Sequence, residues 1–146
     1  MNWPQESCKL VVDFDHQISR WVCKKLNISE SEAEGMAVGF VVKNELIGGL
    51  VFHNLRKDCE LWWTIYTTDK RWCTRSILKQ IFGIAFEFYN VRRISLLVNT
   101  DNYPCINLVE RLGFKKEGCL RQYREDGADC YIYGMLKSEN LWKGKK

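Results

Sequence analysis

Residues 102–118 read NYPCINLVERLGFKKEG, and this stretch decides the fold of the chain. Pro104 suits the first turn of a helix, where its missing N–H and its fixed φ cost nothing. Gly113 directly follows Leu112 and supplies the left-handed residue with which helices commonly end. We therefore predict a short helix that ends at Leu112 and leads into a strand over Phe114–Tyr123.

The segments on either side of this helix alternate between strand-like and helix-like patterns. Runs rich in β-branched and aromatic residues predict strands at Met36–Val42, Leu46–His53, Glu60–Thr67, Arg92–Asn99 and, as a closing hairpin, Phe114–Tyr123 with Asp129–Lys137. Apolar residues at helical spacing predict helices over 13–27 and 74–89. The order is α–β–β–β–α–β–α–β–β, and its central strand–helix–strand requires a right-handed crossover in a mixed sheet.

Length and composition favour a single folded domain. The chain has 146 residues, of which 46% are hydrophobic, 27% are charged and only two are proline. This is enough for one hydrophobic core and too short for two domains. We predict one domain over residues 1–137, followed by a basic tail over 138–146.

Charge, apolar runs and cysteines disfavour several classes of protein. No apolar run approaches the ~20 residues of a membrane span, and residues 1–6 do not resemble a signal peptide, so we expect a soluble, cytoplasmic protein. The net charge is +4, but four lysines and one glutamate from Lys137 onward leave only +1 for residues 1–136, which disfavours nucleic-acid binding. The seven cysteines include no CxxC pair, which disfavours a metal framework. We predict reduced, semi-buried thiols, above all at Cys8, Cys23, Cys119 and Cys130.

The stretch 102–118 resembles the Asn–helix–Leu-Gly-Phe–x-x-Glu-Gly signature of GNAT-type N-acetyltransferases. Residues 120–136 are similar to the end of that fold, and the similarity covers about residues 36–137. It is greatest to the branch of ribosomal-protein N-terminal acetyltransferases and to short acetyltransferases common in phages and prophages. The resemblance implies an α/β (α+β) fold with a mixed, mostly antiparallel central sheet, a splayed central strand pair and helices on both faces.

The resemblance implies acetyl-CoA as co-substrate and indicates which residues would bind it. The predicted contacts are Ile65, Tyr66 and Thr67 for the pantetheine arm, the loop Arg71, Trp72, Cys73, Thr74, Arg75 and Ser76 for the pyrophosphate, and Asn102 and Asn107 for the pantetheine amides. Thr74 and Ser76 stand where the family has glycine or alanine, which lets the backbone approach phosphate closely. The loop must therefore differ or bind less well, although its hydroxyls and Arg75 also suit phosphate. Alternatively, Thr74 simply caps the helix.

Amine acetylation requires the ammonium group to lose a proton before it attacks the thioester. Glu60 lies in Cys59-Glu60-Leu61, where family members often carry Ala-Glu-Ile with a functional glutamate, so it is the predicted base. His53 ends the preceding strand and could lie beside Glu60 and share this role. Alternatively, Glu60 is simply a solvated residue at a strand edge, and His53 is a hydrogen-bonded surface residue at a strand end.

The departing thiolate of coenzyme A must gain a proton. Many relatives use a tyrosine at the position of Val109, and the ribosomal-protein branch has a serine at the position of Cys105. Cys105 is therefore the candidate acid, or else a small residue beside the thioester. Tyr103 and Tyr123 are possible substitutes.

Three functions compete. We predict direct transfer of an acetyl group to a primary amine (a protein N-terminus, a lysine or a small amine) in a ternary complex. The second is a catalytically degenerate CoA-binding or protein-interaction module, which Thr74, Ser76 and Val109 favour. The third is a modifier of nucleic acid or aminoacyl-tRNA that uses the lysine tail, Arg121 and Arg124. Expected partners are acetyl-CoA and an amine acceptor, with no metal or membrane, and an exposed edge strand would permit a homodimer.

Overall fold

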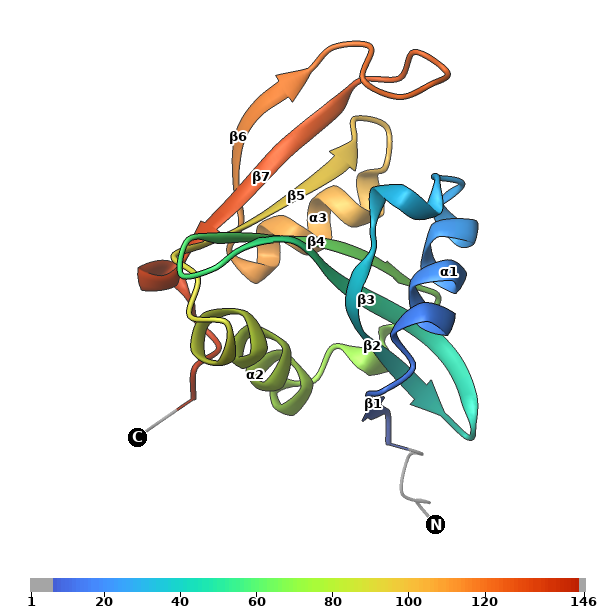
Figure 1. Ribbon diagram of the computed structural model, residues 1–146, viewed down its shortest axis with the longest axis vertical. Coiled ribbons are helices and arrows are strands. Elements are labelled where there is room, and N and C mark those ends of the chain that lie inside the picture. Colours follow the sequence, from blue (N-terminus) through green and yellow to red (C-terminus); the bar gives the residue numbers. More distant parts are fainter. Residues whose placement is uncertain (1–6, 145–146) are drawn as a thin grey trace. The chain divides into compact units, whose positions relative to one another are not determined.

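A computed structural model describes residues 7–144 and is shown in Figure 1. The N-terminal stretch 1–6 and the last two lysines of the predicted tail lie outside the described residues. The chain divides into two compact units, residues 1–54 with 63–80 and residues 55–62 with 81–146. Each unit is described below by itself, and one domain over 1–137 remains a prediction.

Within the described residues, seven strands form one sheet in the order β1-β2-β3-β4-β5-β7-β6. Their bounds are β1 Lys9–Val11, β2 Gly35–Val42, β3 Glu45–Arg56, β4 Glu60–Thr67, β5 Arg93–Asn99, β6 Lys115–Leu120 and β7 Cys130–Leu136. The pairs β1–β2, β2–β3, β5–β7 and β6–β7 are antiparallel. This mostly antiparallel sheet with interspersed helices confirms the predicted fold class.

The core of the first unit forms between helix α1 (Asp15–Leu26) and the strands β2 and β3. Ile18 and Val22 are buried on one face of α1, and they pack in a cluster with Ala37 and Val51. At the start of the helix, Asp15 Oδ1 accepts a hydrogen bond from the backbone N–H of Ala37 at 3.0 Å. The predicted helix is thereby confirmed, whereas β1 was missed because three residues are too few to show a period of two.

Helix α2 (Arg75–Gly83) begins in the first unit and continues in the second as a π-helix, Ile84–Phe88. The backbone N–H of Tyr89 donates to the carbonyl of Ile84 at 2.9 Å, which is the wider hydrogen-bond spacing of a π-helix. Within the second unit Phe82 packs against Phe114, with ring centroids 6.1 Å apart. The predicted helix over 74–89 is therefore present, but its last turn and a half is wider than an α-helix.

Helix α3 (Tyr103–Leu112) follows β5 and confirms the prediction made from residues 102–118. Asn102 caps its start, since its Oδ1 accepts from the backbone N–H of Cys105 at 3.3 Å. Gly113 ends the helix with φ of 110°, a conformation that strains any residue with a Cβ. The hairpin that closes the fold is shorter than predicted, because β6 ends at Leu120.

The first part of the predicted tail is folded onto the second unit. The indole N–H of Trp142 donates to the carbonyl of Leu112 at 2.9 Å, and Glu139 forms an ion pair with Lys115 at 2.7 Å. Asn140 is buried, with 7% of its surface exposed. These contacts cover the C-terminal end of α3, where backbone carbonyls need partners.

The free thiols differ in exposure. Cys8 is half-buried, as predicted, whereas Cys23 and Cys130 are fully buried and Cys119 is exposed on β6. Its strand is the last one of the sheet among residues 7–144. Among the described residues, no helix combines the length and the apolar character needed to cross a bilayer.

Candidate functional site

The loop before α2 carries the predicted pyrophosphate contacts, and its conformation is fixed by Asp69. The Asp69 carboxylate accepts from the backbone N–H of Arg71 at 2.7 Å and so caps the short 3₁₀-helix Lys70–Trp72. The same carboxylate binds the Arg71 guanidinium, with Nε 2.9 Å from Oδ2. A phosphate group would therefore have to share Arg71 with Asp69.

Thr74 caps the N-terminus of α2. Its Oγ1 accepts from the backbone N–H of Ile77 at 3.2 Å, which is the capping role stated above as the alternative. Ser76 is held in the first turn by Gln80, whose side-chain amide donates to the Ser76 carbonyl at 3.2 Å. The first turn of the helix still presents the positive end of the helix dipole, which favours an anion.

A cavity of about 730 Å³ lies beside this loop, within the first unit. It is lined by residues 7–10 and by Lys70, Arg71, Thr74, Ser76, Ile77 and Gln80. The lining residues include three cations and several hydroxyl groups, but neither aspartate nor glutamate. Because charged and hydroxyl donors bind phosphate oxygens strongly, this lining is suited to an anionic group such as phosphate. Lys9, Lys70 and Gln80 were not predicted, and three-residue β1 gave no signal for Lys9.

Trp72 holds the same loop on the core of the first unit. Only 2% of its surface is exposed, and its ring stacks on Phe40 with centroids 5.1 Å apart. The indole therefore points into the protein, and Trp72 as a cofactor contact stays a prediction for its backbone amide. Its neighbours Cys73, Thr74, Arg75 and Ser76 are all exposed.

The end of β4 carries the predicted pantetheine contacts. Ile65, Tyr66 and Thr67 are half-buried. The Tyr66 ring packs edge-on against Trp21 of α1, with centroids 5.8 Å apart, so this side chain belongs to the core of the first unit. Its backbone remains the group that could bind a pantetheine amide.

Glu60 lies at the start of β4, in the second unit, and both of its carboxylate oxygens are bound. Oε1 accepts from Arg56 Nη2 at 2.8 Å and from Arg56 Nε at 3.2 Å. Oε2 accepts from the Ser95 hydroxyl at 2.9 Å, and Arg93 Nε lies 3.4 Å away. Arg93 in turn binds Glu117 of β6 at 2.7 Å. These contacts connect four strands through one network of charged groups.

The surroundings of Glu60 lower its basicity. Burial by itself would raise the pKa of Glu60, but the hydrogen bonds from Arg56 and Ser95 and the charges of Arg56 and Arg93 outweigh it, so the pKa lies below its ordinary value. A carboxylate that is ionised and fully hydrogen-bonded takes up a proton reluctantly. Glu60 as the base remains a prediction, and this geometry favours a positioning role instead. The alternation of Arg93 and Ser95 on one face of β5 was a signal in the sequence for this network.

His53 has partners of its own in the first unit. It is buried, with 6% of its surface exposed, and its Nε2 lies 2.7 Å from Thr64 Oγ1 on β4. Burial lowers the pKa of His53, although the Asn54 side chain and the charge of Glu32 act in the opposite direction. The imidazole is therefore kept neutral, the form that can accept a proton.

The neutral His53 makes stability depend on pH. Because its pKa is lower in the folded than in the unfolded chain, we expect the free energy of unfolding to fall as the pH drops below about 6.5. The slope for this one proton is at most about 1.4 kcal/mol per pH unit. Urea unfolding at pH 7.5 and pH 5.5 should show this loss in the wild type and in His16→Gln, a control on the exposed surface of α1. An equal loss in His53→Gln would contradict the assignment.

Cys105 lies in the first turn of α3 and is half-buried. Desolvation raises the pKa of its thiol to about 11. An ordinary thiol has a pKa of about 8.5, so transfer of a proton from Cys105 to a departing thiolate would run uphill. Cys105 as the acid stays a prediction, but its pKa favours the alternative that it is a small residue fitted into the helix start.

The other residues predicted on and near α3 differ in their positions. Asn102 uses its side-chain oxygen as the helix cap, while Asn107 is exposed.

A hydrogen bond between Tyr133 and Glu110 in this unit was not predicted from the sequence. The Tyr133 hydroxyl on β7 donates to Glu110 of α3 at 2.7 Å, and burial together with this bond raises the pKa of Tyr133 well above its ordinary value. The two residues are far apart in sequence, so no local pattern could connect them.

A sequence model described as "Acetyltransferase (GNAT) domain" matches residues 9–115, and the chain therefore belongs to this family. An N-alpha-acetyltransferase of Sulfurisphaera tokodaii is 46% identical over 46 residues, which are 32% of this chain and 28% of that protein. An uncharacterised N-acetyltransferase of Bacillus subtilis, YoaA, is 30% identical over 100 residues, which are 64% and 56%. The chain spans between 26% and 56% of the length of the curated relatives that it matches.

Solved structures share the fold. The dodecameric spermidine N-acetyltransferase of Vibrio cholerae superposes with a TM-score of 0.71 and 16% sequence identity, over 95% of this chain and 99% of that chain. This likeness establishes a common architecture for the two chains. At this identity it carries no information on the acceptor.

Proposed function

We propose that this protein is an acetyl-CoA-dependent N-acetyltransferase that transfers an acetyl group directly to a primary amine in a ternary complex. The observation that carries the proposal is the cavity of about 730 Å³ beside the loop before α2, with its lysines, arginine and hydroxyls. Family membership supports the reaction type. Acetyl-CoA supplies the activated thioester, and Lys70, Arg71, Thr74 and Ser76 would hold its phosphates.

We further propose the α-amino group of a protein N-terminus as the acceptor. Two archaeal relatives are named N-alpha-acetyltransferases, and they match this chain with 46% and 48% identity over short segments. A polyamine such as spermidine carries several positive charges and would need carboxylates around it. The cavity beside the loop before α2 is lined by neither aspartate nor glutamate. Lysine and small-amine acceptors serve as the comparison in the test.

The protein's own contribution to the reaction would be positioning and proton transfer. Glu60 and His53 are the two candidate proton acceptors, and the pH dependence of kcat/KM, not the loss of rate alone, separates a base from a positioning residue. Cys105 would hold its proton throughout at neutral pH because its pKa is about 11. Without a covalent enzyme intermediate, orientation of amine and thioester supplies much of the acceleration.

The proposal is tested first by thermal unfolding of the reduced protein with acetyl-CoA and with free coenzyme A. A ligand at about 100 times its Kd adds about 2.7 kcal/mol, which raises the midpoint by several degrees in a domain of this size. Thiol release is then followed with a peptide that has a free N-terminus, an N-blocked lysine peptide and spermidine. Release with the first peptide alone supports the α-amine acceptor; no midpoint shift at millimolar ligand would overturn acetyl-CoA binding.

A catalytically degenerate module remains the second candidate. Val109, at the position of the tyrosine of many relatives, is buried with 1% of its surface exposed, so it supplies no acid. A midpoint shift with coenzyme A but no transfer to any amine would support this candidate.

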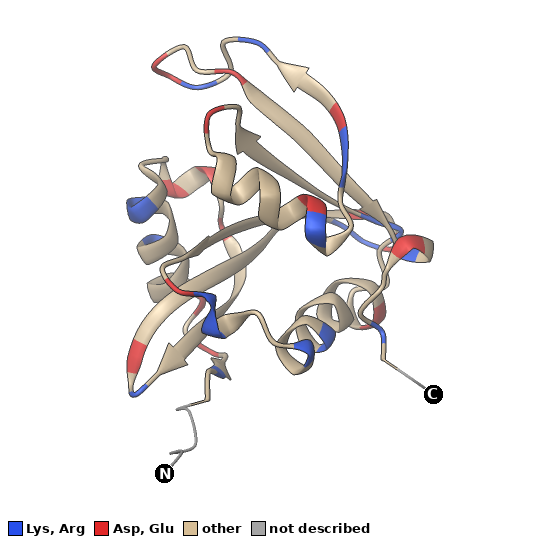
Figure 2. Cartoon of the chain, turned by 180° about the vertical axis from the view of Figure 1, so that it is seen from behind, with Lys and Arg blue, Asp and Glu red and all other residues tan. Residues whose placement is uncertain are grey.

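A nucleic-acid role has less support. Acidic and basic residues are interspersed along the β6–β7 hairpin (Figure 2), and the Arg124 guanidinium donates to Asn99 Oδ1 at 2.9 Å. Homodimer formation and a cytoplasmic location rest on the sequence alone.

Thr74 sets how closely phosphate approaches the loop. We expect Thr74→Gly to tighten acetyl-CoA binding by up to about tenfold, or ~1.4 kcal/mol, because it removes a branched side chain from the start of α2. Glycine is itself a tolerated helix cap, so stability should fall by only a few tenths of a kcal/mol. Titration of intrinsic tryptophan fluorescence measures the affinity, and Thr74→Ser, which keeps the capping hydroxyl, is the control. An unchanged Kd in Thr74→Gly would mean that the native loop already fits phosphate.

A further inference from the structure

A second cavity, of about 470 Å³, lies in the second unit where the ends of several segments meet. It is lined by Cys59, Arg92, Arg93, Leu136, Lys137 and Ser138. Backbone hydrogen bonds hold these segments together. The N–H of Arg92 donates to the Cys59 carbonyl at 2.9 Å, and the N–H of Lys137 donates to the Arg92 carbonyl at 2.8 Å. The lining therefore includes three positively charged side chains on a backbone that is fixed before any ligand arrives.

The three cations differ in how far they are neutralised. Arg93 is paired with the carboxylates of Glu60 and Glu117 and has little charge to offer. Lys137 Nζ donates to Asn90 Oδ1 at 3.0 Å, and Glu87 lies at 4.0 Å from it on the surface. Lys137 therefore keeps much of its positive charge.

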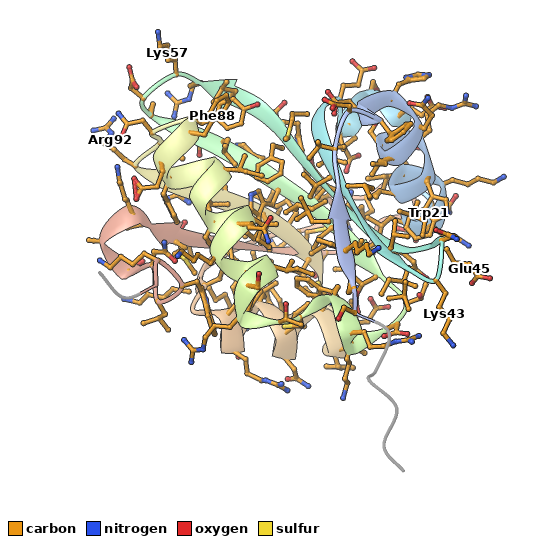
Figure 3. All side chains as sticks on the ribbon, turned by 90° about the horizontal axis from the view of Figure 1, so that it is seen from below. Trp21, Lys43, Glu45, Lys57, Phe88 and Arg92 are labelled. Carbon is orange, nitrogen blue, oxygen red and sulfur yellow. The ribbon has the colours of Figure 1, made fainter. Side chains whose placement is uncertain are left out.

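Arg92 is the cation most available to a ligand. Within residues 7–144, the hydrogen bond found for its side chain joins Nη2 to Cys59 Sγ at 3.5 Å. Sulfur is a weak acceptor, and a guanidinium group has five N–H donors, so most of its binding capacity is unused. Figure 3 shows Arg92 at the same end of the second unit as Lys57 and Phe88. Arginine with free donors binds carboxylate or phosphate in a bidentate manner.

The apolar part of the surroundings favours an organic anion. Leu136 lines the cavity and has 44% of its surface exposed. An exposed apolar side chain in the same cavity as three cations is typical of a binding surface. Ser138, which also lines the cavity, adds a neutral hydroxyl donor.

We propose that this cavity is a ligand site for an oxyanion, a carboxylate or phosphate group, held by the Arg92 guanidinium, the Lys137 ammonium and the Ser138 hydroxyl. The site needs neither acetyl-CoA nor acetyl transfer, so it stands independently of the proposed function. A carboxylate and a phosphate present the same oxygen acceptors to these donors. The two groups differ in charge and in number of oxygens, so separate titrations with phosphate and with acetate show which of them binds.

The test is a titration of the ¹⁵N-labelled protein, followed residue by residue in amide spectra. Sodium phosphate and sodium acetate are added separately up to ~10 mM, ten times a millimolar Kd, while sodium chloride keeps the ionic strength constant. We expect saturable shifts at the amides of Arg92, Arg93, Lys137 and Ser138 with at least one of the two anions. Shifts at residues 71–76 would report the separate loop before α2.

Two variants and a matched control make the outcome decisive. Arg92→Gln and Lys137→Gln should each weaken the saturable shifts at least fivefold, whereas Arg121→Gln, an exposed arginine in the turn after β6, should leave them unchanged. Either charge variant suffices if the other fails to give a dispersed spectrum. The proposal is overturned if neither anion shifts these amides saturably, or if both charge variants bind as the wild type does.

Discussion

Replacing Trp72 with alanine is expected to lower the free energy of unfolding by about 3–5 kcal/mol and to abolish acetyl-CoA binding. The indole is 2% exposed and stacks on Phe40, so its removal leaves a large void that the β-sheet cannot fill by collapse. Domains are commonly stable by only about 5–15 kcal/mol, so the loss is a large share of the total. Urea unfolding monitored by far-UV circular dichroism measures it.

Binding should fail for a separate reason. Trp72 ends the 3₁₀-helix that begins at Lys70, and this short helix sets the course of the chain into the start of α2. Without its anchor, Arg71 and Thr74 no longer hold a fixed position around a phosphate. Binding is measured at low temperature and low denaturant, where the variant is still folded.

Two comparisons separate anchoring from general damage. Trp72→Phe keeps an aromatic ring against Phe40 and should retain most of the stability and a measurable affinity. Trp62→Ala removes the same side chain from a half-buried position on β4 and should cost less stability. If Trp72→Ala binds acetyl-CoA as tightly as the wild type does, the indole does not organise the loop.

The sequence predicted those elements whose signals are local. The helix over 103–112 follows from Pro104 and Gly113 alone, and β4 was predicted at its observed bounds because six of its eight residues are aromatic or β-branched. The π-helix after Gly83 has no such signal, since its apolar residues satisfy a helical period equally well in either form. β1 is too short for any periodic pattern.

The sequence indicated which residues lie at the candidate site more accurately than it indicated what each side chain does there. The residues 71–76 do lie at the start of a helix, but which of them face a ligand depends on packing across the sheet. Trp72 illustrates the difficulty: a tryptophan in a polar loop suggests recognition, and here Phe40, on another strand, buries it. The partners of Glu60 likewise come from β3 and β5, which only the folded sheet brings together.

Glu60→Gln is expected to lower the free energy of unfolding by about 2 kcal/mol and to lower kcat while leaving acetyl-CoA affinity nearly intact. Breaking a fully buried ion pair costs about 3–5 kcal/mol, and the estimate here is smaller because 16% of the Glu60 side chain and 65% of the Arg56 side chain are exposed. The glutamine amide has one accepting oxygen where the carboxylate has two, so either Arg56 or Ser95 loses its acceptor.

The same substitution predicts a change in pH dependence. The folded-state pKa of Glu60 lies below its ordinary value, so its stabilising contribution is complete above the unfolded pKa of about 4.3 and is lost as the pH falls through the folded pKa. Chemical denaturation between pH 6 and pH 3 should show a steeper loss in the wild type than in Glu60→Gln. Parallel curves would mean that the network does not stabilise the fold.

The substitution Ser95→Ala tests whether Glu60 accepts the proton of the amine or only positions its neighbours. The Ser95 hydroxyl donates to Oε2 at 2.9 Å and helps to hold the pKa of Glu60 low, so its removal makes the carboxylate a stronger base. If Glu60 accepts the proton, Ser95→Ala should move the acid limb of the kcat/KM profile to higher pH without a large fall at its plateau. If Glu60 only orients the network, that limb stays in place and the plateau falls with the stability. Because burial and the charges of Arg56 and Arg93 act on the same carboxylate, we expect the second result, with the proton passing instead to His53.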